Sequence, residues 1–301
     1  MLRKTVGIFI SLALVTATAG AAETSPAPVS LSASAIVDRN VAARGGLQTW
    51  RAVKTMSFAG KLTAGGNQRN TIPVPVPDRG PRQKSGKVTL PVRPSEEVQL
   101  PFVMDLKRTR KMRMELQFNG QTAIQVFDGS NGWKLRPFLN RKEVEPYTAE
   151  EMKSSSTQAD LDGYLIDYSA KGTKIELEGN EKVEGLDAYK LKLTTKDGQA
   201  IHVWINAQTF LEAKIEGQPR RLDGVYHPVE IYYRDYKSVR GLQIPHVLET
   251  RVLPASNASA AAAKAGPVQA EKIVIEKVEV NPELEESLFT KPQIGAAPKA
   301  K

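Results

Sequence analysis

The sequence predicts a mainly β protein of the α+β kind, built on one large curved antiparallel sheet or barrel. Between Pro101 and Leu135, apolar and polar residues alternate with a period of two, which indicates strands with one apolar and one wet face. Turn signals such as Asn119-Gly120, Asn131-Gly132 and Lys196-Asp197-Gly198 recur at short intervals. We therefore expect about ten or eleven mostly antiparallel strands, interrupted by two helical segments.

The N-terminus has the pattern of a secretory signal peptide over residues 1–22. Arg3 and Lys4 precede a short apolar run, and small residues follow it. The run is short for a membrane-spanning helix, although an uncleaved N-terminal anchor remains the alternative. Residues 23–32, rich in Ser, Pro and Ala, are expected to form a flexible leader.

The composition favours a periplasmic protein with an apolar core. The 301 residues include no cysteine, so we expect neither a lipid anchor on the chain itself nor a disulfide. The formal net charge of +9 could favour transient contact with anionic lipid head groups, although ordinary solubility charge is the better explanation of the charge alone. Nucleic acid is a poor partner for an exported protein.

Two short helices and a first strand are predicted to begin the domain, which we expect to span 33–290. Apolar residues from Ala33 onward follow a helical stripe, which Gly45-Gly46 should break before a second short helix that carries Trp50. The first strand is expected over Lys54–Leu62. Residues 63–95, rich in Gly, Pro, Lys and Arg, are predicted to be a disordered insertion, either passive or ordered by a partner.

The stretch Pro101–Leu135 predicts four strands joined by tight turns. Met112, Met114 and Leu116 alternate with charged and polar residues, so they should share one face. The pattern leaves open which face points inward, since the side of the strands that carries Phe118 and the side that carries Phe127 both bear apolar groups.

A helical excursion is expected over Tyr147–Tyr168. Thr148 and Glu151 have the spacing of a capping box, in which each side chain bonds the other residue's backbone N–H. Leu161, Leu165 and Ile166 give this segment an apolar side, so it can cover an open apolar face of the sheet.

The chain is predicted to return to strands from Lys174 onward. Turns are expected at Gly179-Asn180, Glu184-Gly185 and Arg240-Gly241, and the last strand over Glu271–Val280. Residues 254–268 form a low-complexity loop, and the tail 291–301 is expected to be disordered.

The sequence lacks the usual catalytic and metal-binding patterns. The three histidines, His202, His227 and His246, lie far apart, and none has a second ligand at metal spacing. Asp160-Leu161-Asp162-Gly163 lacks the later ligands of a calcium loop, so a helix junction is the better interpretation. There is no phosphate-binding glycine loop and no serine-hydrolase elbow. We therefore expect no enzyme activity, cofactor or bound metal.

Three stretches resemble the LolA/LolB-like family of bacterial outer-membrane lipoprotein-sorting proteins. These stretches are residues 36–62, 101–138 and 232–250. The resemblance implies an incomplete barrel around an apolar cavity, closed by helices, which carries lipoprotein acyl chains or other lipids across the periplasm. It further implies a monomer that takes cargo from an inner-membrane donor and passes it to an outer-membrane acceptor. It also implies a strand arginine that holds the lid, for which Arg108, Arg110 and Arg113 are candidates.

The apolar residues of the predicted strands are the candidate cavity lining, since methionine and aromatic side chains can repack around flexible chains. A solid core is the alternative for each of them. The lining set is Phe58, Phe102, Met104, Met112, Met114, Leu116, Ile124, Val126, Trp133, Trp204 and Tyr233. The lid set is Trp50, Leu161, Leu165 and Ile166. A second hypothesis is a periplasmic sensor or adaptor that uses the same fold to bind a protein partner, motivated by the basic insertion at 63–95.

Overall fold

The computed structural model describes residues 31–64, 97–222, 225–255 and 268–293. The chain divides into a unit of residues 1–31 and a unit of residues 32–301, and only the second is treated below. The predicted signal peptide, leader, insertion, low-complexity loop and tail therefore lie wholly or largely outside the described residues. At their borders, Thr63 and Ala64 continue the first strand and Val268 begins the last one.

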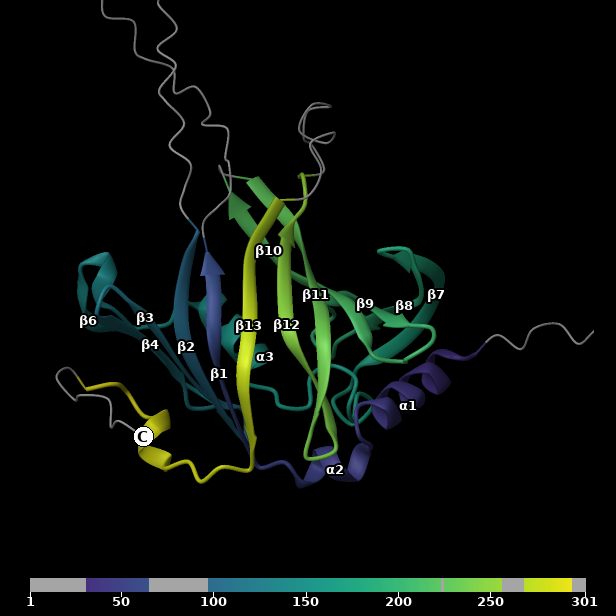
Figure 1. Ribbon diagram of the computed structural model, residues 1–301, viewed down its shortest axis with the longest axis horizontal. Helices are drawn as coiled ribbons and strands as arrows, with labels where there is room; N and C mark the ends of the chain where they lie inside the picture. Colours follow the sequence, from purple (N-terminus) through teal and green to yellow (C-terminus); the bar gives the residue numbers. More distant parts are fainter. Residues whose placement is uncertain (1–30, 65–96, 223–224, 256–267, 294–301) are drawn as a thin grey trace, which may run out of the picture. The chain divides into compact units, whose positions relative to one another are not determined.

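Thirteen strands form a single antiparallel sheet in the order β6-β5-β4-β3-β2-β1-β13-β12-β11-β10-β9-β8-β7. Figure 1 shows this sheet strongly curved. Within the described residues no ladder joins β6 to β7, so the sheet is not closed. The strands are β1 (Thr55–Ala64), β2 (Val98–Lys107), β3 (Lys111–Phe118), β4 (Gln121–Phe127), β5 (Gly132–Arg136), β6 (Arg141–Pro146), β7 (Lys174–Val183), β8 (Leu186–Thr194), β9 (Ala200–Asn206), β10 (Glu212–Leu222), β11 (Val225–Val239), β12 (Leu242–Val252) and β13 (Val268–Val280).

The mainly β prediction is confirmed, with more strands than expected. β6, with the sequence RKEVEP, was missed because its charged residues give no apolar alternation. Two two-residue turns connect their strands as predicted, at Glu184-Gly185 and Arg240-Gly241, and all four of these residues have positive φ.

The hairpin turn at Asn119-Gly120 is also confirmed. Phe118 pairs with Gln121, and the φ angles of Asn119 and Gly120 are 49° and 71°, as a tight hairpin turn requires. The expected two-residue turn at Asn131-Gly132 is wrong. Phe127 pairs with Gly132, so the turn comprises the four residues between them.

That four-residue turn is organised by Asp128. Its carboxylate accepts hydrogen bonds from the backbone N–H groups of Ser130 (2.7 Å) and Asn131 (2.6 Å). This Asx-type bonding replaces the glycine-dependent turn that the sequence suggested. The expected turn at Gly179-Asn180 is likewise wrong, because both residues lie within β7 at an irregularity of the ladder.

Two helices precede the sheet, α1 (Ala33–Ala43) and α2 (Leu47–Ala52), and the predicted glycine break lies between them. Gly45 has a φ of 114°, and a Cβ there would lie 2.3 Å from the carbonyl oxygen of Gly241 in the β11–β12 turn. A larger residue would therefore separate the helices from the sheet.

The helical excursion is shorter than predicted. α3 (Ala149–Gln158) begins at the expected capping box, with both the Thr148 and Glu151 hydrogen bonds present. Its helical structure ends at Gln158, and consecutive turns follow over 161–172. Two short 3-10 helices, η1 (Pro137–Leu139) and η2 (Glu286–Phe289), complete the fold. Among the described residues, no helix has the length and apolar character needed to cross a membrane.

Candidate functional site

One face of the sheet, here named the inner face, carries rows of apolar side chains. Residues paired directly across antiparallel strands point to the same side, so the register identifies these rows. One row joins Phe58, Met104 and Met114 of β1, β2 and β3. The next row toward the helices contains Met56, Leu106, Met112 and Phe127.

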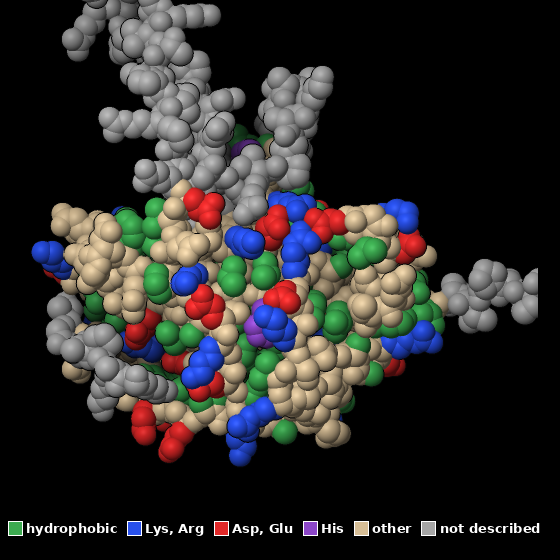
Figure 2. Space-filling model, viewed as in Figure 1, with side chains coloured by type: hydrophobic (Ala, Val, Ile, Leu, Met, Phe, Trp, Pro, Cys, Tyr) green, Lys and Arg blue, Asp and Glu red, His purple; other side chains and the backbone are tan. Residues whose placement is uncertain are grey.

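The register also settles the orientation that the sequence left open. Phe127 pairs with Met112, and Phe118 follows Met112 by an even number of residues along the regular strand β3. Both phenylalanines therefore lie on the inner face. The opposite, outer face carries Arg113 and Glu115, and Figure 2 shows that the side toward the viewer mixes charges of both signs.

Two separate segments cover the inner face. α2 contributes Trp50, and the turns that follow α3 contribute Leu161 and Ile166. All three side chains belong to the same buried cluster as Met56 and Met112 of the sheet. α3 itself is drawn behind the sheet in Figure 1, on the side away from η2. We refer to α2 together with residues 159–172 as the cover.

Arg108, in the turn between β2 and β3, joins the two parts of the cover. Its guanidinium donates two hydrogen bonds to the carboxylate of Asp162, with Nη1–Oδ2 of 2.6 Å and Nη2–Oδ1 of 2.7 Å. It also donates to the backbone oxygens of Trp50 (2.8 Å) and Val53 (2.6 Å) at the end of α2. The hydrogen bond to Asp162, opposed by burial, raises the pKa of Arg108, which therefore stays charged.

Other ion pairs fasten the same turns at their margins. Arg51 donates to Asp167 through Nε (3.1 Å) and Nη2 (2.6 Å). The hydrogen bond from Arg51 lowers the pKa of Asp167 against a smaller effect of burial. Asp160 meets Arg110 at 3.3 Å and Lys171 at 2.9 Å. Asp160 and Asp162 thus form ion pairs with Arg110, Lys171 and Arg108. This role explains two acidic residues in a segment that lacks the other ligands of a calcium loop.

Lys134 of β5 anchors α3 to the inner face. Its side chain is 8% exposed, and its Nζ lies 2.6 Å and 2.5 Å from the two carboxylate oxygens of Glu151. Burial alone would raise the pKa of Glu151, but the hydrogen bonds from Lys134 and from the Thr148 backbone outweigh burial and lower it. Glu151, which belongs to the capping box of α3, therefore also attaches this helix to the sheet.

The structure brings most of the predicted lining residues together on the inner face. By register these are Phe58, Phe102, Met104, Met112, Met114, Leu116 and Tyr233. Met104, Met114 and Leu116 are half-buried against the main cluster, whereas Phe58, Phe102 and Met112 are buried in it. The lid candidates Trp50, Leu161 and Ile166 cover this face, and Leu165 is also buried, with 2% of its surface exposed.

Four predicted lining residues belong to the outer face instead, so the expectation of one shared wall is wrong for them. Ile124 and Val126 pair with Glu115 and Arg113, because the turn at Asn119-Gly120 sets the β4 register that way. Trp133 pairs with Val126 on the same side.

Trp204 is the fourth predicted lining residue that lies on the outer face. It packs with the ammonium of Lys214, 4.0 Å from the ring centroid, and its indole N–H donates to Glu181 at 2.7 Å. Hydrophobicity alone suggested an inward position, whereas the indole covers lysine and glutamate side chains on the charged face.

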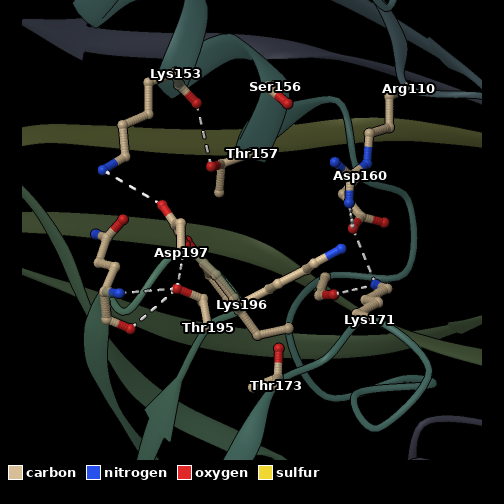
Figure 3. A pocket seen from close by; sticks show the side chains of 13 residues that line it. Arg110, Lys153, Ser156, Thr157, Asp160, Lys171, Thr173, Thr195, Lys196 and Asp197 are labelled. Carbon is tan, nitrogen blue, oxygen red and sulfur yellow. Dashed lines mark hydrogen bonds and ion pairs between the residues drawn. The ribbon is translucent and has the colours of Figure 1, made fainter.

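A polar pocket of about 700 Å³ opens beside α3, and no sequence pattern indicated it (Figure 3). Its lining comes from the β2–β3 turn, α3, the turns over 160–173 and the β8–β9 connection. The lining residues are Arg110, Lys153, Ser156, Thr157, Asp160, Gly163, Tyr164, Lys171, Thr173, Thr195, Lys196, Asp197 and Gln199. None of the predicted lining residues is among them.

The histidines stand apart from one another. His202 Nδ1 lies 2.7 Å from Glu216, while the Nδ1 atoms of His227 and His246 each lie 3.0 Å from a backbone oxygen. Within the described ranges, no group of three or more His, Asp or Glu side chains has a geometry suited to a metal ion. The basic insertion that motivated the adaptor hypothesis lies almost wholly outside those ranges.

Comparison with known proteins gives a fold relationship. No protein-family model matches the chain, and no curated protein sequence matches it. A domain from Vibrio parahaemolyticus, provisionally described as an outer membrane lipoprotein-sorting protein domain, has a TM-score of 0.50 at 14% identity, covering 86% of this chain and 96% of its own. At that identity the likeness establishes a shared fold.

Two further solved structures have lower TM-scores. A LolA superfamily protein from Nitrosomonas europaea scores 0.49 at 13% identity, covering 87% of this chain and 99% of its own. A DUF1329 family protein from Desulfovibrio piger has a TM-score of 0.47 at 13% identity, covering 86% of this chain and 97% of its own. The resemblance to the lipoprotein-sorting family is therefore confirmed as a resemblance of fold, through the Vibrio domain.

Proposed function

We propose that this protein is a periplasmic carrier that shelters the acyl chains of lipoproteins or related lipids against its inner face. The observation that carries the proposal is a continuous apolar face under a cover whose two parts meet at Arg108. The shared fold with the Vibrio domain, whose description names lipoprotein sorting, points the same way.

The inner face has side chains that suit a flexible guest. Met104 and Met114 lie side by side on β2 and β3, and both are half-buried. Methionine has three rotatable bonds and a polarizable sulfur, so it can repack around acyl chains of different length. Burying an acyl chain of roughly sixteen carbons stabilises the complex by on the order of 10 kcal/mol, at about 0.8 kcal/mol for each methylene group.

The cover is held by polar contacts that water can replace. The Arg108 side chain is 32% exposed and the Arg51 side chain 51% exposed, so neither ion pair is sealed from solvent. Exchanging these contacts for water costs far less than an acyl chain gains on burial. A guest chain can therefore displace the apolar side chains of the cover while the sheet stays intact.

Transfer by such a carrier needs no nucleotide. Release follows when a partner of higher affinity binds the cargo or when the cover opens. Under this proposal the chain is exported by its N-terminal segment and works as a monomer between an inner-membrane donor and an outer-membrane acceptor, with transient contact to the membrane surface. It performs no covalent chemistry on its cargo.

The test compares two neighbouring residues of β2 that point to opposite faces. Met104→Arg places a charge on the inner face, whereas Val103→Arg places it on the outer face, where Val103 is already 38% exposed. A fluorescent fatty acid titrated into the full chain should bind the natural protein and Val103→Arg equally, and Met104→Arg at least about tenfold more weakly. Native mass spectrometry of protein purified without detergent should show co-purified lipid.

A milder variant guards against misfolding of the arginine variant. Met114→Gln keeps the side-chain length and adds an amide to the inner face, so it should also weaken binding while the circular dichroism spectrum is retained. Equal binding by the natural protein, Met104→Arg and Met114→Gln would exclude the inner face as the lipid site.

A further inference from the structure

The polar pocket beside α3 is separate from the apolar inner face. It measures about 700 Å³, within the range of small-molecule sites and larger than a single ion needs. Three parts of the chain that are distant in sequence converge on it: the β2–β3 turn, α3 with the turns over 160–173, and the β8–β9 connection. Its walls are therefore set by tertiary structure and belong to no single loop.

Four cationic side chains and only two carboxylates line the pocket. Arg110, Lys153, Lys171 and Lys196 all line it, together with Asp160 and Asp197. Asp160 bonds both Arg110 and Lys171, so one carboxylate holds two cations at the wall. Because a guanidinium has five N–H donors and an ammonium three, both cations keep donors for a further acceptor.

Lys196 has the placement expected of a ligand-binding cation. Its side chain makes no hydrogen bond or ion pair with any residue that the structure describes. Its aliphatic stem lies over Gly172, where a Cβ would be 3.3 Å from the Lys196 Cβ. Figure 3 shows this side chain extended across the pocket toward Asp160 and Lys171.

Thr173 supplies a second, independent sign of a ligand. The residue is 8% exposed, and its hydroxyl has no hydrogen-bond partner among the described residues. Figure 3 shows the hydroxyl directed into the pocket. The hydroxyl oxygen itself is accessible from the pocket, so its O–H is free to donate to an acceptor bound there.

The remaining pair of opposite charges is weak. Lys153 and Asp197 are 3.8 Å apart, with 56% and 63% of their side chains exposed. Such an exposed pair contributes little and leaves Lys153 available to a stronger acceptor. Asp197 is instead held by the Thr195 hydroxyl at 2.5 Å.

We propose that this pocket binds a phosphate group through Lys196, Lys171, Arg110 and the Thr173 hydroxyl. A phosphate has several charged oxygens at tetrahedral angles, so it can accept from cations and hydroxyls on different walls at once. The volume beyond the phosphate accommodates its polar substituent. The source is either a phospholipid head group or a soluble phosphate ester, and the two share this chemistry.

The experiment titrates sn-glycerol 3-phosphate into the full chain by isothermal calorimetry at low, fixed ionic strength. Saturable binding is expected, with affinity about tenfold lower in Lys196→Ala and about fivefold lower in Thr173→Val, which removes the hydroxyl at constant shape. The matched control is Lys182→Ala, an exposed lysine at the far end of the β7–β8 hairpin, which should bind as the natural protein does.

Two results would overturn the proposal. One is the absence of saturable binding at millimolar ester. The other is an equal loss of affinity in Lys196→Ala and Lys182→Ala, which would show nonspecific attraction by positive charge.

Monomeric dihexanoyl phosphatidylglycerol distinguishes the two sources. If the site takes a lipid head group, this short-chain lipid binds at least about tenfold more tightly than the ester, and Lys196→Ala weakens both. If the site takes a soluble ester, the two ligands bind alike. Met104→Arg should leave ester binding unchanged, so failure of the acyl-chain proposal and failure of the phosphate site give different results.

Discussion

Arg108 and Asp162 face each other through two parallel hydrogen bonds, while the same guanidinium bonds the backbone oxygens of Trp50 and Val53. One side chain thus joins α2 to the turns after α3. The two segments are separated by about a hundred residues of chain, and they meet at this point because the β2–β3 turn carries the arginine there.

Arg108→Lys should loosen the cover while leaving the sheet folded. A lysine has the charge but cannot bond a carboxylate bidentately and reach two carbonyls, so we expect a loss of about 1–3 kcal/mol in the free energy of unfolding. Hydrogen exchange should accelerate over 159–172 and α2 first. Arg110→Lys, at a single contact of 3.3 Å, serves as the control and should change stability by less than about 0.5 kcal/mol.

The lowered pKa of Glu184 predicts that the free energy of unfolding falls in acid. The hydrogen bond from Arg234, with a further one from Arg251, lowers the pKa of Glu184 to about 2 against the effect of burial. Since the unfolded pKa is about 4.3, its stabilising contribution is complete above that pH and disappears as the pH falls toward 2.

The measurement is the difference in unfolding free energy between the natural protein and Glu184→Gln. The side chain is 38% exposed, so the difference should be about 1 kcal/mol at pH 7 after allowance for solvent screening. It should shrink steadily between about pH 4.5 and 2. A difference that is independent of pH would contradict the assignment.

Gly132→Ala should destabilise the fold through a clash with Tyr147. A Cβ on Gly132 would lie 1.8 Å from Cδ2 of the Tyr147 ring, so the ring must move. We expect a loss of roughly 2–3 kcal/mol, measured by urea unfolding. Tyr147→Ala in the Gly132→Ala background should recover part of that loss, which a simple backbone effect would not.

Gly120→Ala is the matched control for that clash. A Cβ there meets nothing within 4 Å, but the φ of 71° still strains an L-residue. Its cost should therefore be only about 1 kcal/mol.

Thr148→Ala should destabilise α3 by about 1 kcal/mol, because the hydroxyl accepts from the Glu151 N–H at 3.2 Å. Thr148→Ser keeps that acceptor and should restore the stability. Thermal unfolding followed by circular dichroism measures both. Equal melting temperatures for the alanine and serine variants would show that the cap contributes nothing.

Local sequence patterns predicted the fold better than the positions of individual side chains. The two-residue turns at Asn119-Gly120 and Arg240-Gly241 were predictable because a positive φ strongly selects Asn and Gly. The Thr148–Glu151 capping box was predictable because both partners lie within one turn of helix. β6 was not predictable because its charged residues show no apolar alternation, and the true turn before Gly132 depends on hydrogen bonds to the Asp128 carboxylate.

The candidate site required tertiary information. Alternation alone placed Met112 and Met114 on one face, but only the register shows that Met104 shares this face and that Val126 points the other way. The Arg108 contacts join residues more than fifty positions apart, so no local pattern could reveal them. The polar pocket beside α3 is likewise assembled from side chains that have no motif in common.

The two unpaired edges, β6 and β7, have a mechanical consequence. Most residues of β6 and half of those in β7 are charged, and Pro146 ends β6. These features discourage pairing with another chain. Within the described residues no backbone hydrogen bond crosses the seam between these edges. The sheet can therefore widen or narrow without breaking its ladder. Under the proposed carrier function, acyl chains of different size would then cost side-chain contacts but no strand pairing.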